Sequence, residues 1–364
     1  MLLLKQLKQI PDHRSGQGKK YPLWLLMIIV IIGKFCGYDG YRDLADFCRS
    51  HQKKLWEFLE IEETMSSPSY STLRRLMIEM EPQQWEKVYN TWVKATVSEE
   101  IGHYSSIDGK SIKCTVVGGR TSEQDFVSLV SVYNHENGGV LQLKVMKNKK
   151  VSEIAVGREL IERLKDLSVR QCLTLDALHT QTETVAQIVE ANHDYLIAVK
   201  ENQLSLCKTI EEIDKDCTPI SETIVQDNSH GRQVERKVNV YQAPEHLQQK
   251  WKGLQSLVVV ECQGKREKKD FEEKAYFISS ERSSAEVFLK AIQGHWSIEN
   301  QLHWVKDVTF KEDKPPRQGG HSPVNWAILF SWLITLVRRA EFRTVPQARR
   351  LWANQVDTIF ALLL

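Results

Sequence analysis

Apolar residues recur at helical spacing through the first part of the chain. Four segments, near 21–35, 40–49, 53–60 and 83–96, place apolar residues three or four positions apart, as amphipathic helices do. Polar turns such as "CGYDGYRD" and "TMSSPSYST" separate these segments. The pattern predicts an N-terminal helical domain over residues 1–98.

One helix of this domain carries a pair of arginines. In "SPSYSTLRRLMIEM" a serine or threonine caps a helix that bears Arg74 and Arg75. Such a helix suits a small helical DNA-binding module, in which it would enter the major groove. A purely structural helical bundle fits the same pattern, and both interpretations stay open.

From Ser105 the pattern changes to strands. "SSIDGKSI" predicts a short strand, and "FVSLVSVYNHENGGVLQLKVM" predicts a hairpin, because two alternating runs flank an Asn-Gly-Gly turn. "SEIAVGRELIERLKDL" then predicts a helix behind Ser152, followed by the strand "QCLTLDAL", the helix "TETVAQIVEAN" and the strand "DYLIAVK". This order predicts an α/β fold over residues 99–215, a ribonuclease-H-like mixed sheet with flanking helices, although other α/β folds share part of it.

The remaining chain interrupts and then resumes this core. Residues 216–283 contain three strand-like runs, "RKVNVYQA", "LQSLVVVEC" and "KAYFISS", separated by charged turns, which predict a β-rich insertion. Residues 284–345 are expected to return to the core as its second part, with a late helix. Residues 346–364 are expected to form a C-terminal helical tail.

Composition limits the cellular setting. The seven cysteines form no CxxC motif, and an odd, scattered set is typical of free thiols in a reducing compartment. The most apolar run, Leu23 to Ile32, is shorter than the roughly 18 residues that a membrane-spanning helix needs. We therefore expect a cytoplasmic protein without a membrane partner. The net charge of +2 selects no partner by itself.

Three acidic residues stand where such a core would carry chemistry. Asp108 and Asp176 follow strand candidates, and Glu299 lies in "GHWSIENQLHW" on the late helix. Taken singly, a strand-end aspartate is often a turn former or helix cap, and a buried histidine-glutamate pair would explain Glu299. Together, three convergent carboxylates require a cation, and their oxygens suit Mg²⁺ or Mn²⁺. Trp296 and Trp304 are expected to pack the helix on the sheet, with stacking on DNA bases as the alternative.

Two rival chemistries are weaker. His295, Glu299 and His303 suggest zinc, but the two histidines lie about 12 Å apart along a straight helix at 1.5 Å per residue, too far to share one ion. Tyr104 or Ser106 beside Asp108 suggests a covalent nucleophile, but no arginine-rich setting surrounds them.

Several motifs together resemble one known family. The motifs are "IDGKSI", "TLDALHTQ", "DYLIAVKENQ", "SHGRQVERK", "HWSIENQLHWVKDVTFKED" and the early "IPDHRSGQGKKYPLWLLMIIVIIGKFCGY". Together they resemble the H-repeat-associated family of insertion-sequence transposases, which belongs to the DDE group. The matches run in order from near residue 8 to near residue 340. The resemblance implies a ribonuclease-H-like fold with an interrupted core, divalent metal dependence, and DNA cleavage and joining at element ends.

The resemblance also assigns roles to residues. Asp108, Asp176 and Glu299 would be the catalytic, metal-binding triad, and Lys306 would contact a terminal phosphate. At the positions of the related signature's tyrosine and arginine, this chain has Ile292 and His295. The full set of expected DNA contacts is Lys110, Lys200, Asn202, Gln203, His230, Arg232, Arg236, His295 and Lys306.

The implied function is that of a DNA transposase with two Mg²⁺ or Mn²⁺ ions. Its partners would be terminal inverted repeats and target DNA, bound by a homodimer at the nucleoid of a bacterial-type cytoplasm. A metal-dependent DNA nuclease without integration and a non-catalytic DNA-binding descendant are the alternatives. Intact acidic residues alone do not separate them.

Overall fold

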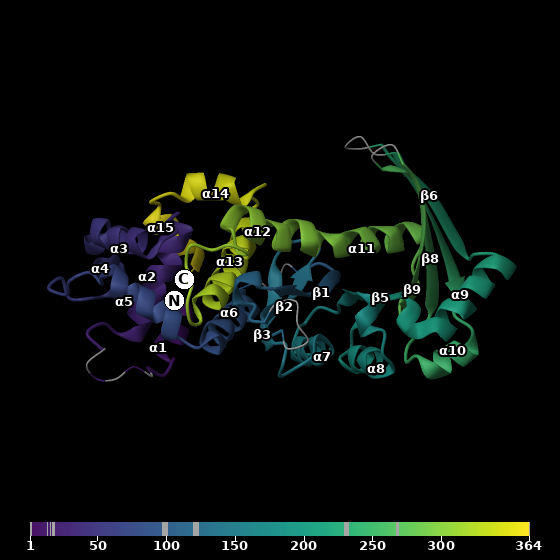
Figure 1. Ribbon diagram of the computed structural model, residues 1–364, viewed down its shortest axis with the longest axis horizontal. Coiled ribbons are helices and arrows are strands. Elements are labelled where there is room, and N and C mark those ends of the chain that lie inside the picture. Colours follow the sequence, from purple (N-terminus) through teal and green to yellow (C-terminus); the bar gives the residue numbers. More distant parts are fainter. Residues whose placement is uncertain are drawn as a thin grey trace.

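A computed structural model describes residues 2–12, 14, 16, 19–96, 101–118, 124–228, 233–266 and 269–363. The molecule is elongated, with a helical bundle at one end, a sheet in the middle and a tall set of strands at the other end (Figure 1).

Helices from both ends of the chain build the bundle. The N-terminal ones are α1 (Leu2–Lys8), α2 (Leu23–Phe35), α3 (Tyr41–Ser50), α4 (Gln52–Leu59), α5 (Tyr70–Glu79) and α6 (Pro82–Thr96). The C-terminal ones are α13 (Ser322–Arg339), α14 (Val345–Trp352) and α15 (Val356–Leu363). Helix α2 is apolar on every side and nearly all of it is buried, because it lies inside this bundle. The C-terminal tail thus packs with the N-terminal helices.

The middle sheet has the predicted ribonuclease-H-like arrangement. Its strands are β1 (Tyr104–Ser111), β2 (Val127–Asn134), β3 (Val140–Lys147), β4 (Cys172–Leu175) and β5 (Asp194–Val199). They lie in the order β3-β2-β1-β4-β5, with β1, β2 and β3 antiparallel and β1, β4 and β5 parallel. The predicted hairpin is confirmed, and Gly138 in its turn has φ +66°, which glycine adopts without strain. Helices α7 (Glu153–Leu164) and α8 (Thr182–Glu190) flank the sheet.

The inserted strands extend the same sheet. After α9 (Leu204–Asp216) come β6 (Ser221–Asp227), β7 (Gln233–Gln242), α10 (Glu245–Lys250), β8 (Ser256–Arg266) and β9 (Lys269–Ser279). The sequence predicted three strands here, and the described residues contain four. The strand that was missed, β6, is an edge strand with little burial, so it lacks the alternation that marks a half-buried strand. Strand β9 pairs antiparallel with β5, which closes the open edge of the core and makes one nine-stranded sheet.

One long helix leads from the insertion back to the core. It consists of α11 (Ala285–Ser297), a π-helical turn (Ile298–His303) and α12 (Trp304–Phe310), which follow one another without a break. Figure 1 shows α11 leaving the tall strands and passing over β1 toward the bundle. A π turn inside an α-helix is uncommon and occurs frequently at functional sites.

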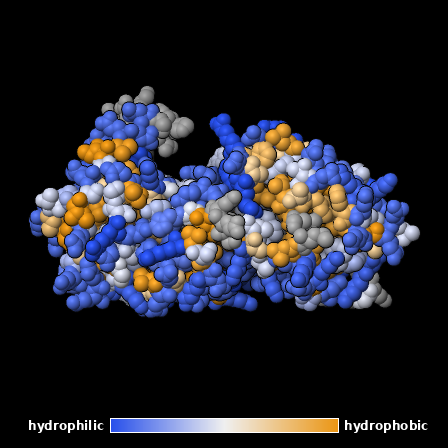
Figure 2. All heavy atoms as spheres, turned by 180° about the vertical axis from the view of Figure 1, so that it is seen from behind, coloured by the Kyte–Doolittle hydropathy of each residue, from blue (hydrophilic) through white to orange (hydrophobic). Residues whose placement is uncertain are grey.

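Polar surface predominates on the face of the molecule that Figure 2 shows. In Figure 2 hydrophobic residues gather in separate patches among hydrophilic ones. No helix within the described residues is both long and apolar enough to cross a membrane.

A buried hydroxyl joins the bundle to the sheet. Tyr89 of α6 donates a hydrogen bond to the Val140 carbonyl at 2.6 Å and lies 3.0 Å from the Thr335 hydroxyl of α13. We expect Tyr89→Phe to lower the free energy of unfolding by about 1–2 kcal/mol, because the buried carbonyl loses its donor. Urea unfolding followed by circular dichroism measures this, and an unchanged midpoint would show that the hydroxyl contributes nothing.

Candidate active site

Strand β1 presents alternate side chains to the long helix. Ser106, Asp108 and Lys110 share one face of the strand, because side chains alternate along it. The Ser106 hydroxyl donates to the His295 carbonyl at 3.5 Å, and the Lys110 ammonium donates to Asp307 Oδ2 at 2.8 Å. Between these two contacts, Asp108 faces the π turn.

Strand register places Asp176 beside Asp108. Ser106 pairs with Thr174 on the parallel strand β4, so the next residue on the same face of each strand is an aspartate. Asp176 keeps an extended backbone, with φ −73° and ψ 172°, just after β4 ends. Neighbouring strands lie about 4.8 Å apart, so both carboxyl groups leave the sheet on one face and at one edge. Asp176 is exposed, and its Oδ1 accepts a hydrogen bond from the Leu178 N–H at 3.1 Å.

The π turn brings two further polar groups to Asp108. His303 Nδ1 lies 3.5 Å from Asp108 Oδ2 and 3.4 Å from Glu299 Oε2. The potential ligand atoms of Asp108, Glu299 and His303 all lie within 4.8 Å of one another. In the part of the chain that the structure describes, Asp176 is not a member of this close group.

The donor set suits a divalent cation. Carboxylate oxygens are preferred by Mg²⁺ and Mn²⁺, and an imidazole nitrogen is acceptable to Mn²⁺ and other transition metals. His303 is almost wholly buried, and its Nε2 has no hydrogen-bond partner within the described residues. The ring is therefore held in the site by packing, with Nδ1 facing the two carboxylates.

The electrostatics of the site show how crowded its negative charges are. Burial and, to a smaller extent, the charges of Glu153, Glu299 and Asp176 together raise the pKa of Asp108 to about 7. A hydrogen bond from His303 lowers the pKa of Glu299, whereas burial lowers the pKa of His303. At neutral pH the site thus holds more carboxylate charge than its own histidine balances.

A layer of buried and half-buried polar side chains lies next to the acids. Thr174 Oγ1 lies 2.9 Å from His295 Nδ1 and 3.0 Å from the Ser106 hydroxyl, which lies 2.7 Å from His135 Nε2. Burial lowers the pKa of both histidines, that of His135 to about 3, so both rings are neutral at pH 7. The layer fixes the long helix against β1 and β4 one turn before Glu299.

Comparisons with known proteins show to which family the chain is related. The family described as "Transposase DDE domain" matches residues 105–333, and "DDE_Tnp_1-associated" matches residues 4–93. The chain is 31% identical over 322 residues to "Putative transposase YncI" of Escherichia coli O157:H7, covering 85% of this chain and 80% of that protein. It is 27% identical to "H repeat-associated putative transposase YhhI" of Escherichia coli strain K12, covering 85% and 83%.

The chain belongs to the H-repeat-associated family of DDE transposases. A cryo-EM structure of a piggyBac transposase synaptic complex with hairpin DNA aligns with 99% of this chain and 76% of that one. Its TM-score of 0.46 and 7% identity are too low to carry an argument about this transposase.

Two lysines predicted to contact DNA are buried in the transposase. Lys110 is 9% exposed and Lys306 is 1% exposed. Lys110 lies 3.9 Å from Glu312 Oε1, and Glu312 is fully enclosed, with a pKa that burial raises. At α-helical pitch Lys306 would share the face of Glu299, but the extra residue of the π turn displaces later side chains by roughly 100° around the axis. As a result Lys306 points inward, where burial lowers its pKa.

Other predicted DNA contacts support the loop behind Asp176. Asn202 Nδ2 donates to the Ala177 carbonyl at 2.7 Å, and Gln203 Nε2 donates to the Thr180 carbonyl at 2.9 Å. Lys200 is exposed and lines a groove of about 870 Å³ together with Asp176. Of these three residues, Lys200 is the one that carries a charge, and its side chain is exposed to a ligand.

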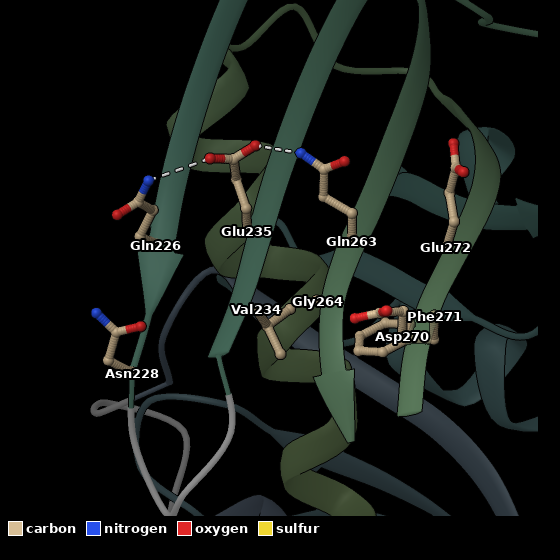
Figure 3. Close-up of a pocket in the computed structure, with 9 residues that line it drawn as sticks. All are labelled: Gln226, Asn228, Val234, Glu235, Gln263, Gly264, Asp270, Phe271 and Glu272. Carbon is tan, nitrogen blue, oxygen red and sulfur yellow. Dashed lines mark hydrogen bonds between the residues drawn. The ribbon is translucent and has the colours of Figure 1, made fainter. Parts of the chain in front are cut away.

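The insertion contributes one described residue of the predicted set. Arg236 on β7 is partly buried and lies 3.4 Å from Asp227. His230 and Arg232 lie outside the described residues. A concave surface near the far end of these strands carries carboxylates and amides, with Glu235 accepting from Gln226 and Gln263 (Figure 3). Its nine lining residues include no lysine or arginine, so they do not suit phosphate.

The expectation that the two tryptophans pack the helix on the sheet is wrong. Trp296 is 63% exposed and Trp304 is 57% exposed. The helix packs instead through Ile298 and Leu302, which are fully buried. Trp296 borders an apolar cavity of about 480 Å³ that reaches Asp176.

Sequence reasoning missed two residues near Asp108. His303 was set aside because a helix alone cannot bring it near His295, yet its spacing of four from Glu299 indicated that those two side chains are neighbours. Glu153 gave a weaker signal, an acidic residue directly after the Ser152 helix cap.

The raised pKa of Asp108 has a consequence for stability. Folding raises this pKa from 3.8 to about 7. Ionisation of Asp108 therefore lowers the free energy of unfolding, fully above pH 7 and not at all below pH 4, where the group is protonated in both the folded and the unfolded chain. We expect ion-free Asp108→Asn to melt at a higher temperature than the unmodified protein near pH 8, with the difference vanishing as the pH falls toward 4. Thermal melts in EDTA measure this, with exposed Glu63→Gln as the control. A melting temperature below that of the unmodified protein near pH 8 would contradict the assignment.

Proposed function

We propose that this transposase cuts the ends of its element by phosphodiester hydrolysis and joins the freed 3′-hydroxyl to target DNA at Asp108, Asp176 and Glu299. The supporting observation is the approach of Glu299 and His303, on the long helix, to Asp108 on β1. These residues come from distant parts of the chain, and a purely structural salt bridge would include a lysine or arginine in place of one acid.

The three acids would hold two divalent ions, Mg²⁺ or Mn²⁺. Two such ions, when bound, activate the attacking oxygen and neutralise the leaving oxygen. The residues themselves provide position: Asp108 is fixed by its strand, Asp176 by the cap it forms on the next turn, and Glu299 by its contact with His303. Because the backbone and buried layer already hold these groups, little reorganisation is needed during the reaction.

DNA would approach from the side of Asp176. The groove there is lined by Lys200 and Lys208, and Leu178 on its wall is 45% exposed. Exposed lysines contact phosphates without selecting a base sequence. Trp296, beyond Asp176, offers an aromatic face on which a base can stack. Inverted repeats and target DNA are the proposed ligands.

Other parts of the chain would read the element ends. Arg74 and Arg75 on α5 are both exposed, as a recognition helix requires. Domain boundaries at 98, 215, 283 and 345 remain our proposal for how the DNA-binding, core and inserted parts divide. A homodimer on DNA would hold two ends together for joining.

Loss of any acid should stop the reaction. We expect Asp108→Asn, Asp176→Asn and Glu299→Gln each to lower cutting of labelled inverted-repeat DNA by at least about a hundredfold, since each removes a cation ligand. EDTA should abolish cutting, and excess Mg²⁺ should restore it. Gel mapping of the 3′ ends measures both effects, with Glu63→Gln as the matched exposed control.

A precleaved end distinguishes the alternatives. A transposase joins such an end to target DNA, whereas a nuclease without integration gives only cut product. A non-catalytic descendant binds the repeats and gives no ion-dependent product. Retained cutting by one of the three variants would remove that residue from the site.

Two lysines near the site should behave differently on DNA. We expect Lys200→Ala to weaken binding to inverted-repeat DNA and to reduce the slope of log K against log salt concentration by about one, because one phosphate contact is lost. Lys110→Ala should leave that slope unchanged and lower the melting temperature, because Asp307 loses its buried partner. Fluorescence anisotropy over a salt series measures the slopes. A reduced slope for Lys110→Ala would show that Lys110 reaches DNA after all.

A further inference from the structure

A fourth carboxylate lies at the proposed site. Glu153 is the first residue of α7, and Ser152 caps this helix by accepting a hydrogen bond from the Ala155 N–H at 3.3 Å. Helix α7 packs on β1, β2 and β3. Its first residue lies next to Gly109, in the part of β1 that extends past its pairing with β4. The charge of Glu153 acts on Asp108, and that of Asp176 acts on Glu153.

Gly109 has no side chain, and the Glu153 carboxylate lies in the space that this leaves. A Cβ atom at this position would stand 2.9 Å from both Cδ and Oε2 of Glu153, too close for real contacts. The paired residues of β1 and β4 end at Ser106 and Thr174, which leaves this edge of β1 open at Gly109. The missing side chain of Gly109 allows this close approach, which an alanine would relieve by displacing the carboxylate.

An ordinary helix-terminal role does not explain this placement. An acid in the first turn favours a helix through the helix dipole, and Glu183 of α8 does this while 70% exposed and 3.3 Å from Arg158. Glu153 also lies in the first turn of its helix but is partly buried. No lysine or arginine within the described residues forms an ion pair with it. Its charged neighbours are carboxylates, an arrangement that is unfavourable until cations bind.

We propose that Glu153 is a fourth carboxylate of the metal-binding site, seated against Gly109 so that it faces a cation beside Asp108 and Asp176. This inference rests on the proposed function. Four carboxylates balance the charge of two divalent ions, whereas the three acids of the family pattern leave one positive charge over. Close packing against Gly109 holds the Glu153 carboxylate next to the residue that follows Asp108.

Ion counting tests the proposal without DNA or catalysis. Mn²⁺ is titrated into the full chain, and free Mn²⁺ is measured by electron paramagnetic resonance. We expect Glu153→Gln to lose one bound ion or to bind Mn²⁺ roughly tenfold or more weakly. Gly109→Ala should act in the same direction, because the added methyl group displaces the carboxylate. Glu183→Gln is the matched control and should bind as the unmodified chain does. Circular dichroism in EDTA checks that each variant is folded.

The outcomes separate this inference from the function on which it rests. Mn²⁺ binding that is unchanged in both Glu153→Gln and Gly109→Ala would overturn the role of Glu153 and leave the triad in place. Absence of Mn²⁺ binding by the unmodified chain would overturn the metal site and the inference together. Weakened binding in both variants, with Glu183→Gln unaffected, would establish the fourth carboxylate.

Discussion

The contact between strand β1 and the long helix is the constraint on which the site depends. Ser106, Asp108 and Lys110 follow one another on one face of the strand, and each meets the helix or its π turn. These contacts hold the Glu299 carboxylate close to that of Asp108, although like charges repel. Parallel pairing of β1 with β4 then sets Asp176 beside Asp108. Two neighbouring strands and one helix thus carry the three acids.

The residues around the site hold its like-charged acids in place. Neutral His135 and His295 fill the layer on one side without adding charge. On the other side Lys110 bonds to Asp307 and stabilises Glu299 through its charge. Strain and unpaired charge at a site are tolerated when tightly packed neighbours fix them, and they reduce stability where function requires it. Ion binding would recover part of that stability.

The insertion leads directly into the long helix that carries Glu299. Strand β9 pairs with β5, so the chain leaves the insertion next to the core sheet and continues directly into α11. Glu299 therefore reaches the site by extension of the sheet, with no separate domain that must dock. The groove beside Asp176 lies where this junction, α9 and the loop after β5 meet, which is where DNA would enter under our proposal.

The sequence by itself determined the local elements, because each depends on near neighbours. Alternation gave the core strands, the Asn-Gly-Gly turn gave the hairpin, and motif similarity indicated Asp108, Asp176 and Glu299. Tertiary structure alone decided which side chains meet. The π turn shifts the side chains that follow it, so helical periodicity placed Lys306 on the wrong face. Trp296 precedes this turn, and its exposure was decided by which side of the helix packs on the sheet. His303 and Glu153 become neighbours of Asp108 only after strand register and helix position are fixed, since no spacing along the chain encodes contacts across two layers.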